Sequence, residues 1–201
     1  MASPDRDERV DPQDTETPHE VERRCVLTGA LALMLAPLGS TAAVEPRNAR
    51  PQPGDTLVYS EGARKGETVV ASDIQQGAAP VFAYPKDPST GTVRDGVRIN
   101  LVLVVRPDPK SISEKMAPLS TDGVVAYSAV CTHYGCQVTL MHPNQRAVVC
   151  NCHGSTFDVG NSGEIIGGPA TRRLAVLPIK SAEGVLTVAA GFIGRLGPPQ
   201  Q

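Results

Sequence analysis

Two short motifs contain most of the cysteine and histidine residues of this chain, which are the side chains that bind iron and zinc most often. The first, CTHYGC, spans residues 131–136, and the second, CNCHGS, spans residues 150–155. Together they supply four thiols and two imidazoles. This donor set suffices for a two-iron, two-sulfide cluster with two cysteines on one iron and two histidines on the other. The alternative is a zinc site, because two cysteines and two histidines commonly bind zinc in small proteins.

The spacing of the ligands favours the cluster over zinc. Zinc sites usually separate paired cysteines by roughly two to four residues, whereas a single residue separates Cys131 from His133. A zinc site also leaves no role for the two additional cysteines of the motifs. Visible absorption distinguishes the two sites, because zinc is colourless.

The two motifs resemble those of Rieske iron–sulfur proteins, in which two loops hold one cluster. The resemblance implies four cluster ligands in this chain: Cys131, His133, Cys150 and His153. A thiolate brings negative charge to iron and a neutral imidazole brings none, so two imidazoles favour the reduced cluster and give potentials of roughly −150 to +300 mV. We therefore expect an electron carrier that accepts electrons from weak reductants such as quinols and has no catalytic site of its own.

The same resemblance assigns roles to residues beside the ligands. Cys136 and Cys152 correspond to the pair that forms a disulfide between the two loops. The Ser155 hydroxyl would donate a hydrogen bond to a bridging sulfide, whereas Phe157 has no hydroxyl with which to add a second one. Residues 167–170, GGPA, resemble the third loop that shields the cluster. The residues expected around the cluster are Tyr134, Ser155, Phe157, Gly168 and Pro169.

Short, β-branched apolar segments separated by glycine, proline, aspartate and asparagine follow one another after residue 55, and this pattern predicts antiparallel strands. The segments are 68–71, 81–84, 97–105, 124–130, 137–140, 147–149, 174–179 and 185–189. We predict an all-β, antiparallel sandwich or barrel of the Rieske type over residues 55–197. The resemblance implies an inserted cluster-binding subdomain at about residues 127–170, and a short helix is expected around residues 111–115.

The N-terminal part of the chain differs in composition from the rest. Residues 1–24 hold eight acidic and four basic side chains and end in an arginine pair, so we expect a disordered acidic tail. Residues 25–44 carry no charged side chain, and an arginine pair before such a segment is typical of a twin-arginine export signal. Export by this route fits the chemistry, because iron–sulfur clusters are assembled in the cytoplasm and the route carries folded proteins. Residues 45–54 contain three prolines and are expected to form a semi-rigid linker.

The apolar segment 25–44 has two alternative fates. Its twenty residues are long enough to span a bilayer, at about 1.5 Å of rise per helical residue, and many Rieske proteins retain such a segment as an anchor. The small residues at 40–43 resemble a signal peptidase site instead. We favour retention. In both cases the cluster domain is expected on the periplasmic face, with the arginine pair on the cytoplasmic side.

Two branches of the family compete for this chain. Residues 80–85, 122–128 and 194–195 resemble the small subunit of arsenite oxidase. Residues 154–155 and 168–170 are more similar to the Rieske subunit of cytochrome bc complexes. Either branch would exchange electrons with a larger catalytic subunit and with a cytochrome or copper acceptor. The net charge of −2 provides no strong field for binding nucleic acid.

Phe157 favours the first branch. Quinol-oxidising bc subunits commonly carry tyrosine at this position, and arsenite oxidase small subunits commonly carry phenylalanine. We therefore predict the arsenite oxidase type, with the bc type as the alternative. The sequence argues against a Rieske oxygenase, which needs a further iron on two histidines and a carboxylate. Only His19 and His142 are left after the cluster is supplied, and His19 lies in the acidic tail.

Overall fold

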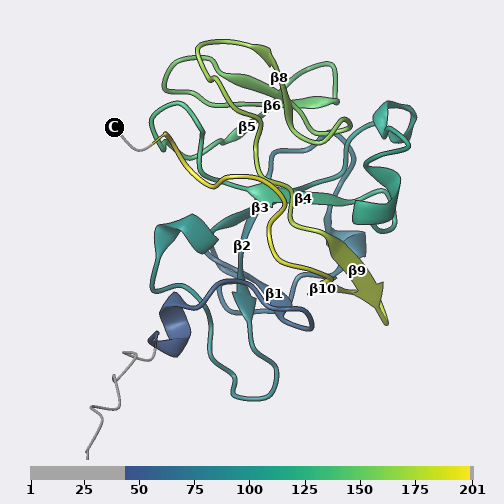
Figure 1. Ribbon diagram of the computed structural model, residues 1–201. Coiled ribbons are helices and arrows are strands. Elements are labelled where there is room, and N and C mark those ends of the chain that lie inside the picture. Colours follow the sequence, from purple (N-terminus) through teal and green to yellow (C-terminus); the bar gives the residue numbers. More distant parts are fainter. Residues whose placement is uncertain (1–43, 200–201) are drawn as a thin grey trace, which may run out of the picture. The chain divides into compact units, whose positions relative to one another are not determined.

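The computed structural model of the protein describes residues 44–199, and ten strands in this range form two sheets (Figure 1). Neighbouring strands within each sheet are antiparallel, which confirms the predicted all-β class. The predicted acidic tail 1–24 and all of the apolar segment except Val44 lie outside the described residues. Between residues 44 and 199, the structure contains no helix with the length and apolar character of a membrane span.

The larger sheet has six strands in the order β4-β3-β2-β1-β10-β9, so the first and last parts of the described chain meet in its middle. Its strands are β1 (Thr56–Tyr59), β2 (Val81–Lys86), β3 (Val102–Val105), β4 (Val125–Ser128), β9 (Ile179–Ala182) and β10 (Val185–Val188). The chain between β4 and β9 forms the smaller sheet.

The smaller sheet has four strands in the order β5-β6-β7-β8 and lies above the larger sheet in the view of Figure 1. Its strands are β5 (Leu140–Met141), β6 (Ala147–Val149), β7 (Thr156–Asp158) and β8 (Glu164–Gly167). All four fall within the range predicted for the cluster-binding subdomain. The two motifs adjoin strands of this sheet: the first ends shortly before β5, and the second occupies the turn between β6 and β7.

The helices among the described residues are single 3-10 turns: η1 (Pro46–Asn48), η2 (Ala71–Asp73), η3 (Arg98–Asn100), η4 (Pro109–Ser111) and η5 (Ala117–Leu119). The helix expected at 111–115 is therefore wrong in position, because η4 ends at Ser111 and a proline begins it. The predicted segment 68–71 makes only isolated bridges, through Thr68 and Val70. Strands β1, β7 and β8 lie outside the predicted segments, because each is short and mixes polar residues with apolar ones.

The core has two parts, one on each face of the larger sheet. Successive side chains of a strand point to opposite faces, so Leu103 and Val105 of β3 join the part that faces the smaller sheet, while Val102 and Val104 join the other. All four residues of β3 and of β4 are buried for this reason. The part that faces the smaller sheet also includes Cys131 and Cys150, so the core positions the two ligand loops directly.

The segment predicted as a linker, residues 45–54, is joined to the larger sheet by a hydrogen bond of 2.9 Å from the Gly54 N–H to the Val188 carbonyl of β10. It contains η1, and the carbonyl oxygen of Ala49 accepts a hydrogen bond of 2.8 Å from the side chain of buried Asn100. Just after it, Asp55 forms a buried ion pair with Arg94, with N–O distances of 2.6 and 3.0 Å. These contacts fix where the described chain enters the sheet.

Candidate metal centre

The two ligand loops close with the same backbone hydrogen bonds. In the first, the Cys131 N–H donates to the Cys136 carbonyl at 2.7 Å, and the Gly135 N–H donates to the Cys131 carbonyl at 2.9 Å. In the second, Cys150 N–H donates to the carbonyl of Ser155 and Gly154 N–H to that of Cys150, both at 2.9 Å. Each loop is thus a tight turn that begins at a cysteine.

A glycine four residues after the first cysteine makes each turn feasible. Gly135 has a φ of +77° and Gly154 a φ of +74°, a region that other residues rarely adopt. These two glycines were not among the predicted site residues, although their equal spacing from Cys131 and from Cys150 is visible in the sequence. The two loops are equivalent in backbone geometry even though their histidines stand at different positions.

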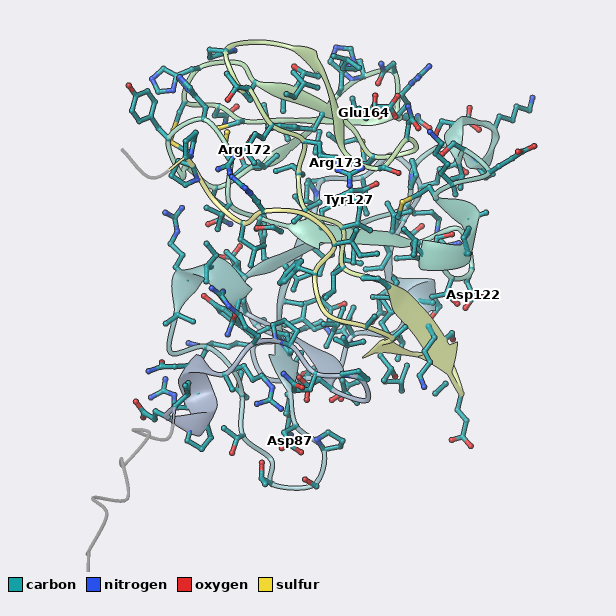
Figure 2. All side chains as sticks on the ribbon, in the orientation of Figure 1. Asp87, Asp122, Tyr127, Glu164, Arg172 and Arg173 are labelled. Atoms are coloured by element: carbon teal, nitrogen blue, oxygen red, sulfur yellow. A yellow bond between two sulfur atoms is a disulfide. The ribbon has the colours of Figure 1, made fainter. Side chains whose placement is uncertain are left out.

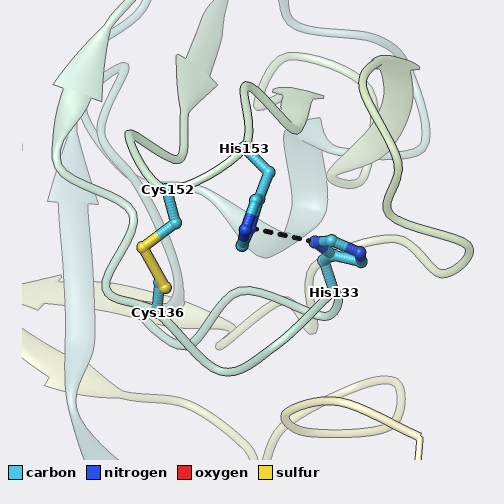
Figure 3. Close-up of a disulfide and its surroundings, with 4 residues drawn as sticks. All are labelled: His133, Cys136, Cys152 and His153. Atoms are coloured by element: carbon cyan, nitrogen blue, oxygen red, sulfur yellow. Dashed lines mark hydrogen bonds between the residues drawn. A yellow bond between two sulfur atoms is a disulfide. The ribbon is translucent and has the colours of Figure 1, made fainter.

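The two loops bring His133 and His153 together (Figure 3). Their Nδ1 atoms are 3.3 Å apart, and their ring centroids are 4.8 Å apart with perpendicular planes. His153 is exposed and His133 is half-buried, so both rings reach the surface of the domain. Two ring nitrogens that face each other at this distance can act as a pair of metal ligands contributed by different loops.

The cysteines fall into two classes. Cys136 and Cys152 form a disulfide that joins the two loops (Figure 3), which is the pairing that the family resemblance implies. Cys131 and Cys150 are free thiols and are 1% and 2% exposed. Burial, together with the neighbouring Cys131 thiol, raises the pKa of the Cys150 thiol, so without a metal it holds its proton. A bound metal ion would displace that proton and stabilise the thiolate.

The proposed ligands do not converge on one point. Among residues 44–199, three potential metal-ligand atoms lie within 4.8 Å of one another only in the group formed by the sulfurs of Cys136, Cys150 and Cys152. Two of these sulfurs, those of Cys136 and Cys152, are already bonded to each other. A single zinc ion would need its four ligands about 2.0–2.3 Å from one centre. Buried thiols on one side and surface imidazoles on the other instead suit a group with two metal ions.

Comparison with known proteins agrees with this geometry. The sequence profile of the family described as the Rieske [2Fe-2S] domain matches residues 85–178. A Rieske iron–sulfur subunit of the cytochrome bc1 complex in Streptomyces lividans is 31% identical over 164 residues, which cover 76% of this chain and 96% of that protein. This chain belongs to the Rieske family. Its cofactor is a Rieske-type 2Fe–2S cluster.

Other relatives extend the comparison. The bc1 Rieske subunit of Streptomyces coelicolor is 31% identical over 83% of this chain, and the alignment spans half of that longer protein. A protein named as the Rieske subunit of a respiratory nitrate reductase in Haloferax mediterranei is 32% identical over 84% of this chain and 73% of its own length. Among solved structures, the plasma membrane Rieske protein of Synechocystis PCC 6803 is 25% identical, with a TM-score of 0.35 over 54% of this chain and 86% of that chain.

The predicted third loop, residues 167–170, packs against the second ligand loop. Gly168 has a φ of +79°, and a Cβ atom there would lie 2.5 Å from Ser155 Cα and 2.6 Å from the Gly154 carbonyl oxygen. The Ser155 hydroxyl is fully buried and accepts a hydrogen bond of 3.2 Å from the Ala170 N–H. Because this oxygen acts as an acceptor, its own proton remains available for an acceptor such as a bridging sulfide.

The remaining predicted residues divide between the core and the surface. Phe157 is fully buried in the core beneath the ligand loops. Tyr134 is 62% exposed, and its ring lies edge to face against His133 with centroids 4.3 Å apart. Pro169 is exposed and lines a cavity of about 390 Å³ that also includes His133 and Tyr134.

Thr132 and Arg172 contribute to the site without having been predicted. The Thr132 hydroxyl donates a hydrogen bond to the Arg172 carbonyl, and the Arg172 guanidinium donates one of 2.8 Å to the Gly197 carbonyl. Arg172 thereby links the first ligand loop to the segment 194–199. No local sequence pattern indicates these contacts, because Thr132 is 40 residues from Arg172 and Arg172 is 25 residues from Gly197.

Proposed function

We propose that this chain is the exported Rieske subunit of a quinol-oxidising complex of the cytochrome bc type, with its cluster domain on the periplasmic face. The observation that carries the proposal is the alignment with the Streptomyces lividans bc1 subunit, which covers nearly the whole of that protein. The arsenite oxidase type, which Phe157 favours, has no counterpart among the relatives described above. The bc type therefore replaces it as the first candidate.

The site geometry supports an electron-transfer role. When bound, the cluster accepts and releases one electron. The buried thiols of Cys131 and Cys150 hold one side of the site away from water, while the imidazoles of His133 and His153 form its outer edge. An exposed imidazole can form a hydrogen bond with the hydroxyl of a quinol or with a polar group of a protein acceptor. Electron donors and acceptors would therefore approach through this edge.

The rest of the site holds that edge in place. The disulfide ties the two ligand loops together, Ser155 and Gly168 join the second loop to the third, and Thr132 ties the first loop to Arg172. Each loop is thus fixed from at least two directions. Such rigidity suits an electron carrier, because a change of oxidation state then requires little movement of the ligands.

A second candidate is a subunit of the arsenite oxidase type, and Phe157 favours it. The side chain at this position lies in the core below the ligands and has no hydroxyl. The Haloferax relative is named as part of a nitrate reductase, so Rieske subunits of related sequence are assigned to more than one kind of oxidoreductase. Phenylalanine at 157 is equally compatible with a bc-type subunit of lower potential.

Purification from native membranes tests the two candidates. The full chain, tagged at its C-terminus, would be isolated in mild detergent and its partners would be examined by haem spectra and by metal analysis. The bc type predicts a co-purifying b-type cytochrome, and the arsenite oxidase type predicts a large molybdenum-containing subunit. A molybdenum subunit without b-type haem would overturn the first proposal. A His133→Ala preparation serves as a control for partners that bind only the cluster-loaded domain.

A further inference from the structure

A second, larger cavity lies next to the one that contains His133 and Tyr134. It has a volume of about 680 Å³, and its lining includes Arg50, Ile99, Arg172, Arg195, Pro198 and Pro199. The two prolines also line the cavity of His133 and Tyr134. The two cavities therefore share a wall that includes these two prolines.

The larger cavity is positively charged. Three of its lining residues are arginines, and none is acidic. Within residues 44–199, the arginines that form ion pairs with carboxylates are Arg47, Arg64, Arg94 and Arg146. None of these four arginines lines the cavity. Like charges around one cavity repel each other, so an anion that enters it relieves that repulsion and gains hydrogen bonds from the guanidinium groups.

The wall between the two cavities is held in a defined position. The Arg172 side chain donates to the Gly197 carbonyl at 2.8 Å, and Figure 2 shows Arg172 beside the C-terminal segment. Gly197 is buried, and Pro198 lies against Gly135 of the first ligand loop, where a Cβ atom would be 3.5 Å from Pro198 Cδ. Arg172 Nε is buried and has no hydrogen-bond partner among the described residues. One wall of the larger cavity, formed by Pro198, thus contacts the first ligand loop.

We propose that this arginine-lined cavity is the docking site for a carboxylate-rich surface of the protein that exchanges electrons with the cluster. The proposal rests on the proposed function, since such a partner must approach the edge formed by His133 and His153. Guanidinium groups bind carboxylates through paired hydrogen bonds. A positive surface beside the electron-transfer edge would also steer an acidic partner toward it and fix its orientation.

Binding of a hexaglutamate peptide to the cluster-loaded full chain tests the proposal. At low ionic strength, Arg50→Gln and Arg195→Gln should each weaken peptide binding by about three- to tenfold, because each removes a charged hydrogen-bond donor. Arg172 is left unchanged because its side chain also holds the wall. Lys180→Gln is the matched control, since it removes one positive charge from an exposed side chain on β9, which does not line the cavity, and should leave the affinity unchanged.

Three results would overturn the proposal. The first is equal peptide affinity in the wild type and both arginine variants, and the second is an equal loss in Lys180→Gln. The third is tight binding of inorganic phosphate, lost in the arginine variants, without binding of the peptide, because this would indicate a site for small anions. Visible absorption spectra of each variant would check that it retains its cluster. The peptide measurement does not depend on which complex the chain joins, so it can succeed or fail independently of the co-purification experiment.

Discussion

The Tyr127 hydroxyl donates a hydrogen bond to the Val159 carbonyl oxygen over 2.6 Å, and this contact joins the two sheets. Tyr127 lies on β4 of the larger sheet and is fully buried, and Val159 directly follows β7 of the smaller sheet. Figure 2 shows Tyr127 where the sheets meet. The second ligand loop connects β6 and β7 of the smaller sheet, so this bond helps to set the position of that loop relative to the larger sheet.

Tyr127→Phe should lower the free energy of unfolding at neutral pH by about 1–3 kcal/mol, because it leaves a buried carbonyl without its donor. Chemical denaturation of the cluster-loaded protein measures the change. Tyr134→Phe is the matched control, since that side chain is 62% exposed, and it should change the stability by less than about 0.5 kcal/mol.

The same variant has a pH signature. Burial raises the pKa of Tyr127, so the folded state holds the phenol proton more tightly than the unfolded chain does. Stability from this difference is fully present below the unfolded pKa of about 10 and is lost as the pH rises above it. The difference in stability between wild type and Tyr127→Phe should therefore shrink above pH ~10. A constant difference up to strongly alkaline pH would contradict the buried-phenol explanation.

Gly168→Ala should displace the second ligand loop. The new Cβ atom would lie 2.5 Å from Ser155 Cα, so the third loop and the second ligand loop must move apart. We expect reduced iron content and a more labile cluster, measured by metal analysis and by the decay of visible absorption. Gly66→Ala separates the contact from backbone strain, because Gly66 has a φ of +85° with nothing within 4 Å. It should cost about 1–2 kcal/mol of stability and leave the cluster intact. Equal cluster loss in both variants would argue against the contact.

Ser155→Ala should lower the reduction potential by some tens of millivolts. By family resemblance its hydroxyl donates to a bridging sulfide, and for a one-electron couple about 59 mV corresponds to 1.4 kcal/mol. Protein-film voltammetry measures the shift. Ser128→Ala is the control, because Ser128 is also buried and its hydroxyl also accepts a backbone N–H bond, from Val130 at 3.2 Å, outside the ligand loops. An unchanged potential in Ser155→Ala would show that the Ser155 hydroxyl does not stabilise the reduced cluster.

Phe157→Tyr, measured in the same way, should raise the potential by some tens of millivolts if the added hydroxyl reaches a cluster ligand. Phe157 is fully buried in the core, so Phe157→Leu provides a comparison that changes packing without adding a hydroxyl. Similar shifts in both variants would assign Phe157 a packing role alone.

His133→Ala, His153→Ala and Cys131→Ser should each abolish the cluster, seen as loss of iron and of the electron paramagnetic resonance signal. Cys136→Ser and Cys152→Ser should instead retain some cluster and lower the stability by about 3 kcal/mol on the chain-entropy account, since their disulfide closes a separation of 16 residues. Cys25→Ser, in the apolar segment before the domain, serves as a control for the general loss of a thiol. If Cys136→Ser lost its cluster as completely as Cys131→Ser, the ligand and disulfide roles would have to be exchanged.

Replacing Arg23 and Arg24 by lysine should keep the protein in the cytoplasm, because the twin-arginine route reads the arginine pair and not merely the charge. Cell fractionation with cluster-specific spectroscopy checks the location of the loaded protein. A second variant with Arg6 and Arg9 replaced by lysine controls for changes in the acidic tail. Normal export of the first variant would rule out the twin-arginine signal.

The cofactor was predictable from the sequence because the ligands are local. Cys131 and His133 lie within one short motif, and so do Cys150 and His153, so their chemistry and spacing are visible without a fold. The all-β class was equally accessible, since strand propensity and turn residues are properties of short segments. Strands β7 and β8 could not be predicted from the sequence, because their pairing within the smaller sheet stabilises them more than the strand propensity of their own residues does.

Tertiary structure alone decided how the loops are held and what surrounds them. Gly168 against Ser155, Tyr127 against Val159 and Arg172 against Gly197 are contacts between residues that are distant in the chain. Their existence depends on how two sheets pack, and side-chain packing of this kind has no local signature. For the same reason, Arg50, Arg172 and Arg195 are separated in the sequence, and only the fold places them around one cavity beside the cluster site.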